Sequence, residues 1–175
     1  NLIYNNELSD DIQDGGDYMM SMSYLMSWKG PVLEKDDPYG TKNNNKTWNS
    51  VKHVQEAQII PEKDYKQIKN MVYKYGGVES SMYMSMSSRN MSSVYYNETE
   101  YAYCYKGKNK PNHDVVIIGW DDNYSKELFN DQTIEGDGAF ICMNSWGDDF
   151  GYHGVFYVSY YDDLIGTNNV CYTKI

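Results

Sequence analysis

The sequence has little of what several classes of protein depend on. Only 15 Lys and Arg residues stand against 25 Asp and Glu, which gives a formal net charge of −10. Binding to nucleic acid requires clustered cations, and the basic residues here are scattered among acids, so we predict no nucleic-acid partner. No hydrophobic run approaches the length of a membrane span, and the first residues, NLIYNNELSDD, lack the basic start and apolar centre of a secretory signal.

Cysteine and histidine are also scarce. The chain has three Cys and three His, and the cysteines (Cys104, Cys142 and Cys171) show no CxxC spacing. A zinc site needs about four such ligands at short spacing. We therefore expect no metal and no cofactor.

The 175 residues suffice for a single unit with a real core. Apolar residues at helical spacing and a following Gly-Pro pair predict a helix from Asp17 to Lys29. A second helix is expected to open at Pro61 and to end at Gly76-Gly77. Beyond it the pattern is β-rich, so helices precede strands and the fold class is predicted as α+β. The expected strands are Val78–Met86, Tyr101–Lys106, His113–Trp120, Gly138–Asn144, Val155–Tyr160 and Asn169–Thr173.

Two polar positions on these strands could carry chemistry. His113 opens the apolar run HDVVIIGW, and Asn144 ends the strand FICMN, just before Trp146. If the two strands are neighbours, the Asn144 amide can hydrogen-bond one imidazole nitrogen, which leaves the other free to take a proton from a nucleophile. An amide partner suits a thiol better than a hydroxyl. The alternatives are a structural histidine and a tight NSWG turn plugged by an aromatic ring.

Together these segments resemble the papain-like cysteine peptidases. NHDVVIIGWDD is similar to the histidine strand of that family, and FICMNSWGDDFGYHGVFYVSYYD to its Asn-Ser-Trp-Gly segment. The stretch from ELSDD through GGDY to DDPY resembles the family's Gly-Gly turn, helix and Pro-Tyr loop. The resemblance implies that His113 is the general base, Asn144 orients it, Trp146 shields their hydrogen bond, and Gly15 and Gly16 pair with an extended substrate; a simple helix-entry turn is the alternative for the two glycines.

The resemblance also implies the architecture. We expect one papain-like domain over residues 1–175, with residues 1–60 as the remainder of a helical lobe and residues 61–175 as a lobe with an antiparallel, barrel-like sheet. The family's nucleophilic Cys and oxyanion-stabilising Gln precede the Gly-Gly turn, and no matching segment occurs here, so the domain is expected to be incomplete at its N-terminus.

None of the three cysteines in the sequence is expected to replace the missing nucleophilic Cys. Cys142 lies between apolar neighbours on the strand leading to Asn144, and we expect a buried, unreactive thiol. Cys104 and Cys171 fall near positions that some family members bridge, so the resemblance makes a disulfide between them an even alternative to free thiols.

Asp114 departs from the family pattern, in which the residue after the histidine is small. A buried carboxylate must be hydrated, protonated or paired. We hypothesise that Asp114 favours Lys or Arg in the adjoining substrate subsite; a salt bridge within the protein is the alternative.

The resulting hypothesis is a secreted or cell-surface cysteine endopeptidase that acts on peptides or proteins and is inactive as this chain alone. A separate N-terminal fragment could carry the nucleophilic Cys. The alternative is a non-catalytic papain-like relative that serves as a peptide-binding or cell-surface module.

Overall fold

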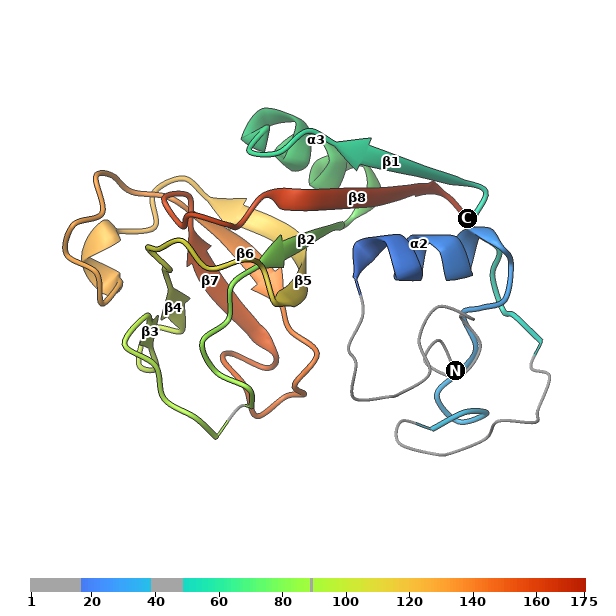
Figure 1. Ribbon diagram of the computed structural model, residues 1–175, viewed down its shortest axis with the longest axis horizontal. Coiled ribbons are helices and arrows are strands. Elements are labelled where there is room, and N and C mark those ends of the chain that lie inside the picture. Colours follow the sequence, from blue (N-terminus) through green and yellow to red (C-terminus); the bar gives the residue numbers. More distant parts are fainter. Residues whose placement is uncertain (1–16, 39–48, 89) are drawn as a thin grey trace. The chain divides into compact units, whose positions relative to one another are not determined.

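The computed structural model of the protein describes residues 17–38, 49–88 and 90–175. It has the predicted α+β character: within these residues, two α-helices accompany a mostly antiparallel sheet of eight strands (Figure 1). The elements are α2 (Tyr18–Met26), β1 (Glu56–Ile60), α3 (Tyr65–Tyr75), β2 (Val78–Met82), β3 (Tyr96–Asn97), β4 (Ala102–Tyr103), β5 (His113–Asp121), η2 (Lys126–Leu128), β6 (Ala139–Met143), β7 (Val155–Ser159) and β8 (Thr167–Lys174).

The described chain divides into two compact units. One contains the described residues up to Gln58 together with Tyr172–Ile175, and the other is Ile59–Cys171. The second unit holds β2 to β7, α3 and most of β8. It therefore contains both strands on which the candidate residues were predicted.

In the first unit, α2 begins where an acidic side chain caps it. The Asp17 carboxylate accepts hydrogen bonds from the backbone N–H groups of Met19 and Met20 at 2.9 and 3.0 Å. These donors have no partner within the helix, so the cap satisfies them. The helix ends at Met26, three residues before the predicted end at Lys29.

In the second unit, α3 starts later than predicted. Pro61 precedes the helix, whose N-cap is Asp64, with its carboxylate accepting from Gln67 N–H at 3.0 Å. Between them Lys63 adopts a φ of 59°, and its backbone N–H donates to the Gly166 carbonyl at 2.7 Å. This contact to a distant loop keeps residues 61–64 out of the helix. At the other end Gly76 takes the left-handed cap conformation, φ 94°, as the Gly-Gly pair predicted.

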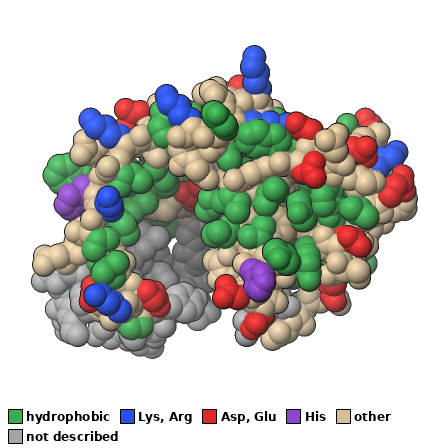
Figure 2. Space-filling view, turned by 180° about the vertical axis from the view of Figure 1, so that it is seen from behind, with side chains coloured by type: hydrophobic (Ala, Val, Ile, Leu, Met, Phe, Trp, Pro, Cys, Tyr) green, Lys and Arg blue, Asp and Glu red, His purple; other side chains and the backbone are tan. Residues whose placement is uncertain are grey.

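The strand order is β1-β8-β2-β5-β6-β7-β4-β3, and only the short β4–β7 pair is parallel among the registers described. The alternating burial of β5 and β6 places side chains such as Ile117 and Cys142 in the core beneath α3. Val116 and Met143, direct cross-strand partners, lie on the opposite face and are 39% and 47% exposed. Hydrophobic side chains also gather over a broad area on the right of the face shown in Figure 2.

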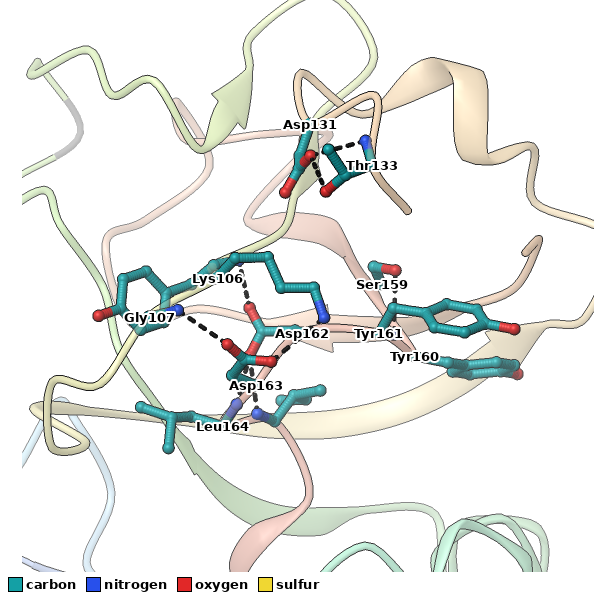
Figure 3. A network of polar contacts seen from close by, with 12 residues as sticks. Lys106, Gly107, Asp131, Thr133, Ser159, Tyr160, Tyr161, Asp162, Asp163 and Leu164 are labelled. Carbon is teal, nitrogen blue, oxygen red and sulfur yellow. Dashed lines mark hydrogen bonds and ion pairs between the residues drawn. The ribbon is translucent and has the colours of Figure 1, made fainter. Parts of the chain in front are cut away.

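A buried carboxylate organises the turn that leads from β7 to β8 (Figure 3). Asp162, only 2% exposed, accepts from the backbone N–H groups of Tyr105, Leu164 and Ile165 at 2.7 to 2.9 Å. Its neighbour Asp163 accepts from Lys106 Nζ and from the backbone N–H of Gly107. Because Tyr105, Lys106 and Gly107 belong to the segment after β4, the two aspartates fasten that segment to the turn after β7.

Candidate active site

The two predicted polar residues meet at one edge of the sheet. His113 is the first residue of β5, and Asn144 directly follows β6. The two strands are antiparallel neighbours, with Val116 opposite Met143, so the start of β5 and the end of β6 lie side by side. Hydrogen bonding along the ladder therefore positions both side chains.

The hydrogen bonds of Asn144 determine which imidazole nitrogen carries a proton. Asn144 Oδ1 lies 2.9 Å from His113 Nε2 and accepts from the backbone N–H of Ser145 at 2.8 Å. A backbone N–H can only donate, so the Asn144 atom at this position is the oxygen. Nε2 must then be the donor of the second bond. In the neutral imidazole Nδ1 consequently bears the lone pair.

Trp146 packs against the imidazole. Its ring centroid is 5.2 Å from that of His113, and it meets Phe150 edge-on at 5.0 Å. Asn144 is 7% exposed, and its Nδ2 group has no hydrogen-bond partner among the described residues. Leaving a buried donor unpaired costs about 1–3 kcal/mol, so the arrangement favours the orientation of Oδ1 over complete hydrogen bonding of the amide.

The loop after β6 is closed by backbone bonds and by glycine geometry. The N–H of Asn144 donates to the Gly154 carbonyl at 2.9 Å, and the N–H of Gly154 donates to Phe150 at 2.7 Å. Gly151 has a φ of 59°, and a Cβ there would stand 2.2 Å from the Val155 carbonyl oxygen. The glycines of this segment therefore allow the turn that holds Asn144 and Trp146 beside His113.

A cavity of about 350 Å³ opens beside the imidazole. It is lined by Tyr83, Met84, Ser85, Met86, Ser87, Asn112, His113 and Trp146. The Asn112 amide holds one wall in place, since Oδ1 accepts from Met84 N–H at 2.7 Å and Nδ2 donates to the Met84 carbonyl at 3.0 Å.

The sequence did not predict the cavity wall formed by residues 83–87. The Val78–Met86 pattern was interpreted as one strand, but β2 ends at Met82. The alternating burial of Met84 and Met86, each 3% exposed, continues without strand pairing. The neighbouring polar pair Asn112-His113 was the signal that could have indicated the wall.

Asp114 lies next to the site and accepts a hydrogen bond from Ser81 Oγ at 2.6 Å. Ser81 Oγ in turn accepts from Asn168 Nδ2 at 3.2 Å. Asp114 is half-buried, and within the described part of the chain no Lys or Arg forms an ion pair with it. The alternative of an internal salt bridge is thus not found there.

The cysteines lie away from the imidazole, in the core. All three thiols are free and buried, so the suggested Cys104–Cys171 disulfide is not formed. Cys104 packs with Phe129 and Ile134 in one hydrophobic cluster, whereas Cys171 belongs to another, which separates the two sulfur atoms. Burial raises the pKa of Cys142 well above its usual value, as expected for an unreactive thiol.

Gly15 and Gly16 lie outside the described residues. Among the residues that are described, no group of three or more His, Cys, Asp or Glu side chains could hold a metal ion. The same residues include no helix that is long and apolar enough to cross a membrane.

Several solved structures have a similar fold. The clostridial cysteine protease Cwp84 after propeptide cleavage matches with a TM-score of 0.82 and 30% identity over 97% of this chain and 43% of that one. The cysteine protease and lectin-like domains of Cwp84, a surface layer associated protein of Clostridium difficile, match with a TM-score of 0.70 and 33% identity over 89% and 36% of the two chains. Bromelain from Ananas comosus has the same fold, with a TM-score of 0.64, at 19% identity over 93% and 71%.

The fold and the His–Asn–Trp arrangement define a papain-like peptidase domain. The sequence profile described as papain family cysteine protease matches residues 7–174, and the chain belongs to that family. It spans less than half the length of either Cwp84 chain. No curated protein sequence matches it.

Proposed function

We propose that this chain is the histidine-bearing part of a cysteine endopeptidase. The observation that carries the proposal is the 2.9 Å hydrogen bond from His113 Nε2 to Asn144 Oδ1. It leaves Nδ1 as the proton acceptor, and Nδ1 has no hydrogen bond among the described residues. Membership of the papain family supports a thiol as the group that Nδ1 serves.

In the proposed reaction, Nδ1 takes the proton of the thiol and an ion pair forms. The thiolate attacks the peptide carbonyl, and the imidazolium returns the proton from Nδ1 to the leaving amine. Nδ1 then accepts a proton from the water that hydrolyses the acyl-enzyme. Asn144 holds the ring orientation throughout, and Trp146 keeps water away from the Nε2–Oδ1 bond.

The nucleophile is not one of the cysteines in this sequence. Cys104, Cys142 and Cys171 are 1% exposed or less, and burial raises the pKa of each. We therefore propose that a segment outside these 175 residues, or a separate N-terminal fragment, supplies the Cys and the oxyanion-stabilising Gln. Gly15 and Gly16 would bind the substrate backbone.

Asp114 is proposed to favour Lys or Arg in the neighbouring subsite. The only hydrogen-bond partner of its carboxylate among the described residues is the neutral Ser81 hydroxyl, so a cationic substrate side chain would supply the missing counter-charge. Cleavage of a peptide library by the complete enzyme tests this: an exclusive preference for apolar residues at that position would contradict it.

We also propose location at the cell surface or outside the cell. This is supported by the similarity to Cwp84, which is described as a surface layer associated protein. Recovery of the protein only from the cytosol of its host would contradict the proposal.

The function is tested first on the chain by itself. Because no thiol reaches His113, we expect no thiol-dependent cleavage of a mixed peptide library by the purified 175-residue chain. Cleavage that is lost after alkylation, in a preparation free of any companion fragment, would overturn the proposal. Saturable peptide binding, with no thiol in the complete gene product to serve Nδ1, would instead favour the non-catalytic peptide-binding module.

A further inference from the structure

The Ile59–Cys171 unit contains a second cavity to which the peptidase reaction assigns no role. Its volume is about 390 Å³, and it shares no lining residue with the cavity beside His113. It is lined by Asn90, Met91, Tyr96, Glu98, Tyr101, Asp149, Phe150 and Gly151. The edge-on contact between Trp146 and Phe150, at 5.0 Å, joins the walls of the two cavities.

Two buried aromatic rings provide an apolar wall. Tyr96 and Phe150 are 7% and 3% exposed and stack with their centroids 5.5 Å apart and their planes inclined by 16°. Burial, with smaller contributions from Tyr101 and Glu98, raises the pKa of Tyr96 to about 12. The Tyr96 hydroxyl therefore stays protonated at neutral pH.

Two further lining residues, Tyr101 and Gly151, are held by their backbone geometry. Tyr101 adopts a φ of 54°, in the left-handed region that residues other than glycine rarely occupy. Its carbonyl accepts a hydrogen bond from Tyr157 N–H at 2.8 Å. Gly151 cannot carry a side chain without striking the Val155 carbonyl oxygen. This part of the cavity is consequently preformed, as ligand sites commonly are.

The charged side chains that line this cavity are all acidic. The exposed carboxylate of Glu98 lies on the lining together with Asp149, and none of the eight lining residues is Lys or Arg. An aliphatic chain with a cationic end fits such a site, because its methylene groups cover aromatic rings while its charge lies close to π faces and a carboxylate.

We propose that this cavity binds a Lys or Arg side chain of a peptide that runs from His113 past Trp146. The inference rests on the proposed peptidase function for the path of the peptide, and it adds a requirement for a basic residue beyond the cleaved bond. Glu98 supplies the charge contact, and Tyr96 and Phe150 supply the apolar one.

The test is an NMR titration of the ¹⁵N-labelled chain with Nα-acetyl-lysine amide, whose side-chain ammonium is free, and with its uncharged counterpart, Nα-acetyl-norleucine amide. We expect saturable shifts of the Tyr101, Phe150 and Gly151 amides with the lysine probe, and binding of the norleucine probe that is weaker by roughly two- to fivefold, the size of an exposed charge contact. Glu98→Gln should reduce lysine binding by a similar factor and leave norleucine binding unchanged.

Glu135→Gln is the matched control, since Glu135 is exposed and lines neither cavity. It should leave both affinities unchanged. Equal affinities for the two probes, shifts confined to other residues, or equal losses in both variants would overturn the proposal. Binding of the probes needs no nucleophilic thiol, so this result is independent of the cleavage assay.

Discussion

At the residue scale, the orientation of one amide decides the chemistry of the site. Asn144 Oδ1 accepts from Ser145 N–H and from His113 Nε2, and this leaves the lone pair on Nδ1. The sequence predicted that the two side chains would be paired, because His113 begins one strand and Asn144 ends another. It gave no information on which ring nitrogen is used, because that depends on the backbone N–H of Ser145.

Replacing the Asn144 amide should change the populations of the two neutral tautomers of His113. With Asn144→Ala we expect the Nδ1–H tautomer of His113 to become populated beside the Nε2–H tautomer, because water can hydrogen-bond to either ring nitrogen. Imidazole ¹⁵N chemical shifts at high pH measure this, and the unmodified chain should show protonation at Nε2. Ser145→Ala retains the backbone N–H and should behave like the unmodified chain. Unchanged tautomer populations in Asn144→Ala would contradict the assignment.

The cysteines make a second prediction at this scale. Burial, with a smaller effect from Asp162, raises the pKa of Cys104 from 9.0 to about 12. A raised pKa in the folded state means that the protonated thiol contributes stability below pH 9.0, which is lost progressively as the pH rises toward about 12.

The denaturation midpoint should therefore decrease as the pH is raised from 9 to 12. Relative to its own midpoint at pH 8, a Cys104→Ala variant should show a smaller decrease. Iodoacetamide at pH 8 should label none of the three thiols in the native chain and all of them in denaturant. Rapid labelling of the native chain would show that a thiol is accessible, contrary to this account.

At the scale of elements, the sequence predicted those that have a strong local pattern. The strands β5, β6 and β7 were predicted correctly, with ends within one residue of those found. The strands β1 and β3 were missed: β3 has only two residues, and β1 shows no regular alternation of burial. The start of α3 was placed too early because a contact of Lys63 to the distant Gly166 overrides the helical preference of Pro61.

The loop after β6 can be tested with a pair of glycines. Gly151 and Gly76 both have positive φ, but a Cβ at Gly151 would strike the Val155 carbonyl, whereas a Cβ at Gly76 would meet nothing within 4 Å. We expect Gly76→Ala to reduce the free energy of unfolding by about 1 kcal/mol and Gly151→Ala by roughly 1 to 3 kcal/mol more. Urea denaturation measures both.

The two substitutions should also differ at the site. Gly151→Ala should change the His113 imidazole resonances, because the loop holds Asn144, whereas Gly76→Ala should not. Equal costs for the two variants, with unchanged His113 signals, would argue against the rigid loop.

At the scale of the whole molecule, the sequence motifs were sufficient for the family and the fold class. They left open whether Cys104 and Cys171 form a disulfide or remain free thiols. The structure has free thiols in separate hydrophobic clusters, and this depends on packing between distant segments. Gly15 and Gly16 lie outside the described residues, so their role remains a prediction. The part of the candidate site that the structure describes comprises His113, Asn144 and Trp146.

The central claim is that His113 serves a thiol supplied from beyond these 175 residues. The most direct measurement is thiol-dependent peptide cleavage by the protein expressed from its complete coding sequence, compared with its His113→Ala variant. We predict activity that iodoacetamide abolishes and that His113→Ala lowers by at least about 100-fold, the usual contribution of a general base. Cleavage that survives either change, or a complete coding sequence without a further Cys, would contradict the account.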